Sequence, residues 1–317
     1  MRNHYRVVLF FLFVLSIFSC SRGTKFEFPL VQKYTVQGGD VFYFRPRDAQ
    51  FVLVERRKAL AVAIAPEPTL EAFSYPDQIT ISRPQPDGKM LENRTLLEKI
   101  SPQPVLAISA DSHFLAGGDS NGVVNIWNTA TGELELQLNK QSAVQSLAFS
   151  PDNNSLAIGL AKAAAESTDT IWLYDVRAHS AHRSFGGKSV PALAWSSDGR
   201  WCAAGLDDGS VLLSEAGSYG EPKRIALSTS PVISLAFHPS GFFLASAHAD
   251  KRILLSKLPT GEHLFTFEPP LPPNPFFPRV IEGIAFDPSG SRLASDYADG
   301  EIRIWDTTAL AKSLAKQ

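Results

Sequence analysis

The sequence predicts an all-β fold built from repeated small antiparallel sheets. In the stretch 280–306, three apolar runs of four or five residues alternate with turns rich in Asp, Ser and Gly, and this punctuation is typical of a strand meander. The pattern recurs upstream, and its second run places Leu115, Leu156, Cys202, Leu244 and Leu293 at equivalent positions, 41, 46, 42 and 49 residues apart. A period in the forties with four strands per unit predicts a β-propeller of four-stranded antiparallel blades.

Each repeat contains the same runs in the same order. The first run reads LAIS from Leu106, SLAF from Ser146, ALAW from Ala192, SLAF from Ser234 and GIAF from Gly283. The second reads FLAGG from Phe114, SLAIG from Ser155, WCAAG from Trp201 and FLASA from Phe243. The third reads VNIWN from Val124, IWLYD from Ile171, VLLSE from Val211 and ILLSK from Ile253. One such sheet cannot bury both of its faces alone, so its neighbours must cover it and the copies are expected to form a closed ring.

These runs resemble the WD-repeat propeller family. The family's dipeptide stands as Trp305–Asp306 and, in altered form, as Trp127–Asn128 and Tyr174–Asp175. Two blades lack it, and the Gly-His pair that precedes each blade in the family is absent. The resemblance therefore implies a propeller over residues 104–308 with an incomplete His–Ser–Asp–Trp hydrogen-bond network. It implies no particular activity, because propellers have many functions.

The N-terminal part of the fold, residues 26–103, is expected to add one degenerate blade. Its strands are expected at 51–55, 59–64, 78–82 and 90–97, with 65–76 as a loop. Val41–Phe44 is expected to form the outer strand of the last blade, so that pairing of the two chain ends removes the exposed edges. Six blades are expected, with seven as the alternative, and 309–317 is expected to be a C-terminal tail.

Residues 1–19 have the features of an export signal. Arg2 and Arg6 precede an apolar stretch at 7–18, which is shorter than the ~20 residues that a spanning helix needs and suits a secretory signal peptide. The segment Ile17–Cys20 resembles a bacterial lipobox, which implies an acylated Cys20, a short tether at 20–25 and a location on a membrane of the bacterial cell envelope. The alternative is ordinary cleavage that leaves a soluble periplasmic or secreted protein.

Composition and motifs argue against several function classes. The net charge is −2, which leaves no electrostatic footprint for nucleic acid, and the two cysteines predict no disulfide framework. The sequence lacks the common catalytic and phosphate-binding motifs, and the first runs carry no His, Asp or Glu that could line a channel. Cys202 is expected in the core, and His179, His182, His238 and His248 are expected at solvated turns. No metal or cofactor is therefore expected.

The expanded links supply the candidate site. In a propeller, the links between second and third strands and those between blades emerge on one face. The segments 65–76, 161–169 and 268–279 are expected there, and the last contains six prolines around two phenylalanines. Rigid proline and exposed aromatics favour partner binding. The candidate residues are Phe73, Tyr75, Pro272, Pro275, Phe276 and Phe277. The predicted function is a non-enzymatic protein-interaction scaffold. The alternative is a propeller hydrolase or lyase that acts on a small or sugar-like substrate at the channel mouth.

Overall fold

The computed structural model describes residues 30–35, 41–45, 50–54, 61–64, 70–82, 94–98, 102–162, 169–218, 220–268, 280–297 and 301–310. Within these residues the protein is built from 26 strands, grouped into six four-stranded sheets and one two-stranded sheet. All strand pairs in these sheets are antiparallel. The all-β prediction is therefore confirmed.

Five sheets follow the repeats found in the sequence. The first contains β8 (Val105–Ile108), β9 (Phe114–Gly118), β10 (Val123–Asn128) and β11 (Leu134–Asn139). The second contains β12 (Val144–Phe149), β13 (Ser155–Leu160), β14 (Ile171–Asp175) and β15 (Ser180–Phe185). The third contains β16 (Ala192–Trp195), β17 (Trp201–Gly205), β18 (Ser210–Glu215) and β19 (Lys223–Ala226). The fourth contains β20 (Val232–Phe237), β21 (Phe243–His248), β22 (Ile253–Lys257) and β23 (Glu262–Phe267). The fifth contains β24 (Ile281–Phe286), β25 (Arg292–Tyr297) and β26 (Glu301–Asp306).

The N-terminal strands complete this last sheet in a different way from the prediction. The fourth strand of the β24–β26 sheet is β1 (Leu30–Thr35), in which Lys33 lies opposite Arg303. The expectation that Val41–Phe44 fills this position is wrong. That segment lies in β2 (Val41–Arg45), which pairs with β3 (Gln50–Val54) in the two-stranded sheet.

The degenerate blade also differs in its strands. Its sheet contains β4 (Ala61–Ile64), β5 (Glu71–Ser74), β6 (Gln78–Ser82) and β7 (Arg94–Glu98). The expectation that 51–55 belongs to this sheet is wrong, because β3 pairs with β2 instead. The expectation of a loop across 65–76 is wrong for 71–74, since β5 pairs with both β4 and β6. The remaining connection, 65–70, joins the first and second strands of this sheet, so its expected place among the links between second and third strands is also wrong. At the other end of the chain, 308–310 form a helical turn, and the rest of the predicted tail lies outside the described residues.

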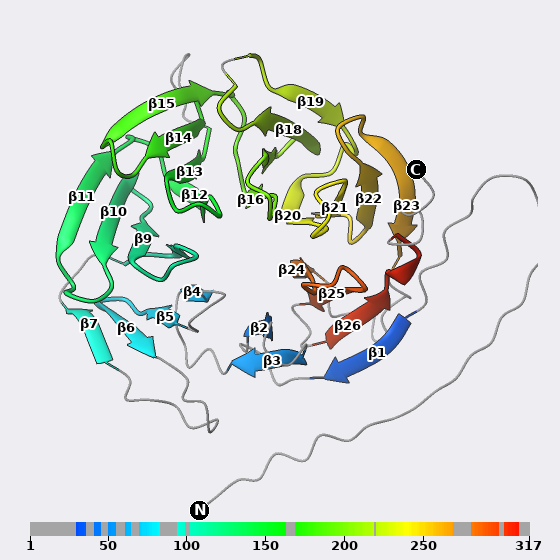
Figure 1. Ribbon diagram of the computed structural model, residues 1–317, viewed down its shortest axis with the longest axis horizontal. Helices are drawn as coiled ribbons and strands as arrows, with labels where there is room; N and C mark the ends of the chain where they lie inside the picture. Colours follow the sequence, from blue (N-terminus) through cyan, green and yellow to red (C-terminus); the bar gives the residue numbers. More distant parts are fainter. Residues whose placement is uncertain are drawn as a thin grey trace, which may run out of the picture.

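The sheets lie around a central axis, with the first strand of each repeat nearest to it (Figure 1). Consecutive first strands contact one another from β4 through β8, β12, β16 and β20 to β24. Figure 1 shows the β2–β3 pair between the β4–β7 sheet and the β24–β26 sheet. Two of the first strands contain a long polar side chain, Gln145 in β12 and Glu282 in β24, and both residues are exposed.

The apolar core lies between neighbouring sheets. The five residues that mark the repeat are at most 2% exposed and occupy the same position of each second strand: Leu115, Leu156, Cys202, Leu244 and Leu293. One apolar cluster joins Ala72 and Ile79 to Leu115, and another joins Phe267 to Trp305 and Ile281. Because each cluster draws on two sheets, no sheet buries its apolar surface without a neighbour.

The glycines that end two of the second strands allow this close packing. A Cβ atom on Gly118 would lie 2.4 Å from Val144 Cγ1, and one on Gly205 would lie 2.4 Å from Val232 Cγ1. Each valine opens the first strand of the next sheet. Glycine is therefore needed at the last position of FLAGG and of WCAAG, because the neighbouring sheet approaches the backbone closely there.

Trp305 keeps part of the hydrogen-bond network that the family resemblance implies. Its indole Nε1–H donates to Ser295 Oγ at 3.2 Å, and that hydroxyl lies 3.3 Å from the Tyr297 hydroxyl. The hydrogen bonds thus form a chain of three side chains, from Trp305 through Ser295 to Tyr297. The Trp305 ring is 7% exposed and packs against Phe267 of the preceding sheet, with 5.3 Å between ring centroids.

Candidate functional site

The residues predicted to bind a partner are not equally accessible. Phe73 is 6% exposed and lies in β5, so its side chain belongs to the core and not to a loop. Tyr75 is half-buried in the short turn between β5 and β6, where its N–H donates to Gln78 O. Pro272, Pro275, Phe276 and Phe277 lie outside the described residues.

The connections between strands differ in length between the two faces of this arrangement of sheets. We call one the link face, formed by the links between second and third strands and by those between sheets. Its two longest links, 161–170 and 268–280, leave the ends of β13 and β23. We call the other the turn face, formed by the remaining turns. Its five turns between first and second strands, in the sheets from β8 onward, each have five residues: 109–113, 150–154, 196–200, 238–242 and 287–291.

A shared hydrogen-bond pattern fixes these turns. The Ser150 hydroxyl donates to Asp152 Oδ1 and accepts the Ser155 backbone N–H at 2.9 Å. Ser109 and Ser196 repeat both bonds in their own turns. In the last turn the Asp287 carboxylate takes the place of the serine and accepts the Arg292 N–H at 2.9 Å.

Hydrogen bonds also join each of these turn regions to the next. Four such bonds run in sequence around the turn face, each between two neighbouring sheets. They are Asp111 N–H to Asn153 Oδ1 (3.2 Å), Trp195 Nε1–H to Ala148 O (3.2 Å), Ser197 Oγ to Pro239 O (2.8 Å) and His238 Nε2 to Gly290 O (3.1 Å). On the described turn face, these hydrogen bonds therefore restrict the movement of each turn relative to the next.

His238 is one of these connecting residues, and its burial contradicts the expectation of a solvated turn. Its ring is 3% exposed and lies edge-on to Phe243 and Phe286. The Ser240 backbone N–H donates to Nδ1 at 3.1 Å, so Nδ1 carries no proton and Nε2–H donates to Gly290 O. Burial lowers the pKa of His238 below its ordinary value, while the Gly290 carbonyl and the Asp287 charge act in the opposite direction.

His248 is also buried, contrary to expectation. It is 1% exposed, and its Nδ1 contacts Ser230 O at 2.9 Å while its Nε2 contacts Ser246 Oγ at 2.9 Å. Burial lowers the pKa of His248, and the Arg252 charge adds to this; the Ser230 carbonyl and the Asp250 charge oppose it. His179 is exposed, as expected, and the His182 side chain is not among those described.

These two histidines predict a specific loss of stability in mild acid. A folded-state pKa below about 6.5 means that the unfolded chain takes up the proton first. The contribution of each neutral histidine to the free energy of unfolding is then fully present above about pH 6.5. It falls as the pH drops toward the folded-state pKa, by up to about 1.4 kcal/mol per pH unit for each histidine. Urea unfolding between pH 7.5 and 5 should show this slope.

Substitutions assign the slope to particular side chains. His238→Gln and His248→Gln should each flatten it, whereas His263→Gln, at an exposed position on β23, should leave it intact. The pKa values of turn carboxylates such as Asp152 and Asp198 are lowered from 3.8, so these groups change the free energy of unfolding only in stronger acid, near and below that pH. A midpoint that stays constant from pH 7.5 to 5 would contradict this account.

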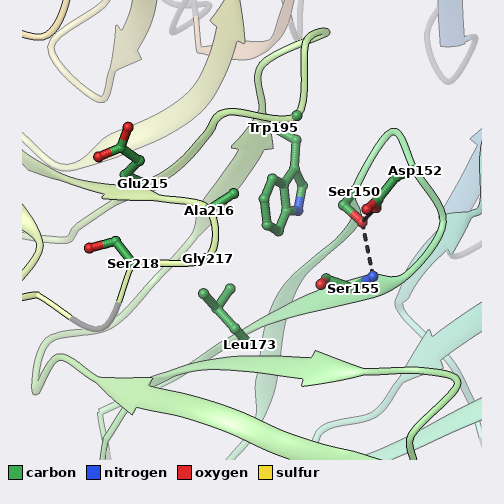
Figure 2. Close-up of a pocket in the computed structure, with 10 residues that line it drawn as sticks. Ser150, Asp152, Ser155, Leu173, Trp195, Glu215, Ala216, Gly217 and Ser218 are labelled. Carbon is green, nitrogen blue, oxygen red and sulfur yellow. Dashed lines mark hydrogen bonds between the residues drawn. The ribbon is translucent and has the colours of Figure 1, made fainter.

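A small cavity opens on the turn face between the β12–β15 and β16–β19 sheets (Figure 2). Its volume is about 160 Å³. Figure 2 shows the Trp195 indole between two turns, with Ser150 and Asp152 on one side and the backbone of 216–218 on the other, and Leu173 below. The cavity thus combines an aromatic wall, an apolar floor and a polar rim.

Asp152 gives this cavity a negative charge. Burial raises the pKa of the carboxyl, but hydrogen bonds from Ser150 and from the Asn154 backbone and side chain outweigh it and hold the pKa below its ordinary value. Those donors are all neutral. The second carboxylate on the rim, Glu215, is already paired with Arg200 at 3.3 Å. Asp152 is therefore the acidic group at the cavity whose charge no described cation offsets.

The described residues offer few side chains that could bind a metal ion or act as a nucleophile. Those residues contain no group of three or more His, Cys, Asp or Glu side chains that could hold a metal ion. Burial raises the pKa of the Cys202 thiol to about 12, so this core cysteine, placed as predicted, stays protonated and is a poor nucleophile. The described helices include none with the length and apolar character needed to cross a membrane.

The sequence interpretation missed this cavity because its residues are far apart in the chain. Ser150 and Ala216 come from different repeats, and only the packing of two sheets brings them together. The one available signal is the Ser-x-Asp pattern that recurs at 109–111, 150–152 and 196–198.

Comparisons with known proteins identify WD40 repeats in this chain. The model of the WD domain, G-beta repeat, matches residues 176–213, 222–255 and 278–306. The chain is 25% identical over 256 residues to telomerase Cajal body protein 1 of Mus musculus, which covers 74% of the chain and 45% of that protein. It is 26% identical over 205 residues to periodic tryptophan protein 2 of Arabidopsis thaliana, covering 63% of the chain and 21% of that protein.

A third relative has a similar partial match. The chain is 30% identical over 149 residues to WD repeat-containing protein SL1-17 of Schistosoma mansoni, covering 46% of the chain and 47% of that protein. The chain thus spans about half or less of the length of these relatives. The prediction of a non-enzymatic protein agrees with the WD40 repeats and with the names of these relatives. WD40 repeats are thus present over the three matched stretches of the chain.

Proposed function

We propose that this protein is an exported WD-repeat scaffold that holds protein partners on its link face. The observation that carries the proposal is the difference between the two faces. In the sheets from β8 onward, the turn-face connections have at most seven residues and hydrogen bonds join the five-residue turns, whereas the longer links 161–170 and 268–280 are on the opposite face. Longer connections on one side of a repeat fold often form its binding surface. The WD40 repeats of the chain are consistent with such a role.

The proposed ring includes the β2–β3 pair as an incomplete seventh blade. Its place between the β4–β7 and β24–β26 sheets supports this arrangement, as does the contact between β2 and β24. The pairing of β1 with β26 would then close the last blade with a strand from the N-terminal end. A crystal structure with residues 41–54 outside the ring would contradict the seven-blade arrangement.

Binding through the 268–280 link predicts a separable loss of partner capture. Deleting residues 269–278 should abolish co-purification of partners from envelope fractions. The melting temperature should change by less than about 2 °C, because loop shortening alters closure entropy only slightly. The matched control is Asp111→Asn on the turn face, which should leave capture unchanged. Full capture by the deletion variant would show that this link is not the binding surface.

Attachment through Cys20 is the second part of the proposal. Two or more acyl chains anchor a protein stably, since each buried CH₂ contributes about 0.8 kcal/mol. Mass analysis of the mature amino terminus should therefore find an acylated Cys20, and Cys20→Ser should move the protein from the membrane to the soluble fraction. The control is Ser21→Ala, which should stay with the membrane. An unmodified amino terminus elsewhere in the chain would support ordinary cleavage instead.

A further inference from the structure

We propose that the turn-face cavity between the β12–β15 and β16–β19 sheets binds an arginine side chain of a protein partner. The cavity lies on the face opposite the proposed link-face site, so this inference does not depend on the proposed function. Its volume of about 160 Å³ is below the ~300–1,000 Å³ typical of sites for drug-sized ligands. A cavity of this size suits a single side chain.

The charge of the cavity selects a cation. Asp152 is ionised at neutral pH. The Ser150 hydroxyl and the Asn154 backbone donate to its Oδ1, and the Asn154 side chain donates to its Oδ2. One lone pair of Oδ2 can therefore accept a further hydrogen bond. The described residues that line the cavity include no lysine or arginine. Arg200, which is not among the lining residues, lies over the Trp201 ring at 5.0 Å and is paired with Glu215. A cation entering the cavity would therefore meet an uncompensated carboxylate.

The walls of the cavity favour a guanidinium over an ammonium. The Trp195 indole is fixed by its Nε1–H bond to Ala148 O and forms one wall of the cavity beside Asp152 (Figure 2). A planar guanidinium can stack on an indole while its in-plane N–H groups donate to a carboxylate and a hydroxyl. The Ser155 hydroxyl, on the same side as Asp152, is a suitable second acceptor.

The cavity is also preformed. Ser150 holds the Asp152 turn closed, and Trp195 is bonded to the neighbouring sheet. Leu173 below is 3% exposed and anchored in the core. Little conformational freedom is lost when a side chain enters such a site, which favours binding.

The test uses two small probes that have nearly the same shape and different charge. The full chain, labelled with ¹⁵N and held in detergent micelles, is titrated with N-acetyl-arginine amide and separately with N-acetyl-citrulline amide. The Trp195 indole N–H resonance, assigned with Trp195→Phe, reports on the cavity. The arginine probe should shift it saturably in the millimolar range, and the neutral citrulline probe should bind at least about tenfold more weakly.

Two variants locate the charge. Asp152→Asn should weaken binding of the arginine probe by about tenfold. Asp111→Asn, which alters the equivalent turn one sheet away and does not line the cavity, should bind as the unmodified chain does. The absence of a saturable shift, an equal response to citrulline, or undiminished binding by Asp152→Asn would each overturn the proposal. The comparison of probes does not use Asp152→Asn, so it holds even if that variant fails to fold.

Discussion

Trp305→Ala should destabilise the protein by about 3–5 kcal/mol, the range for truncating a buried tryptophan. The ring is 7% exposed and fills the space between two sheets, where it packs on Phe267. Its removal leaves a cavity and deprives Ser295 of its indole donor. Since domains are commonly stable by only about 5–15 kcal/mol, the loss should be visible as a large shift of the urea midpoint. A loss of unfolding free energy below about 1 kcal/mol would contradict a structural role for Trp305 in the Trp305–Asp306 dipeptide.

Two companion variants separate packing from hydrogen bonding. Trp305→Phe keeps much of the apolar volume and removes the N–H donor, so it should destabilise by about 1–2 kcal/mol. Trp172→Ala is the control at a half-buried tryptophan, whose exposed side lies under the Lys140 ammonium at 3.6 Å. It should cost about 1–2 kcal/mol through the lost cation–π contact and the smaller buried area.

The repeats between residues 105 and 306 could be predicted because their strands are specified locally. Each second strand places a fully buried apolar residue after a five-residue turn, as Leu156 and Leu244 show. The N-terminal strands could not be predicted in the same way. Leu30–Thr35 and Val41–Arg45 are both short strands of mixed polarity. Which of them pairs with β26 depends on the arrangement of the ring rather than on either sequence.

The candidate site shows a similar limit. Phe73 is predicted to lie in the loop 65–76, but β5 places it in the core. His238 looked like a turn residue, and it does stand at a turn. Its burial comes from the neighbouring sheet, whose Gly290 carbonyl accepts its Nε2–H. Contacts between blades therefore decide which turn residues are exposed, and a single repeat does not contain that information.

Gly290→Ala should test the contact between His238 and the last sheet directly. Gly290 has φ +69°, and a Cβ atom there would lie 2.1 Å from His238 Nε2. The alanine would meet two penalties: the left-handed backbone costs about 1–2 kcal/mol, and overpacking against a buried ring adds about 1–3 kcal/mol. We expect a total loss of about 3–4 kcal/mol in the free energy of unfolding, measured by urea titration at pH 7.5.

Gly217→Ala is the matched control for this prediction, because Gly217 has nearly the same φ, +70°, and a Cβ atom there would meet nothing within 4 Å. It should show the backbone penalty alone, about 1–2 kcal/mol. The difference between the two variants then measures the displacement of His238, and it should shrink when His238→Ala removes the ring. Equal losses for the two glycines would mean that the last two sheets do not meet at this histidine.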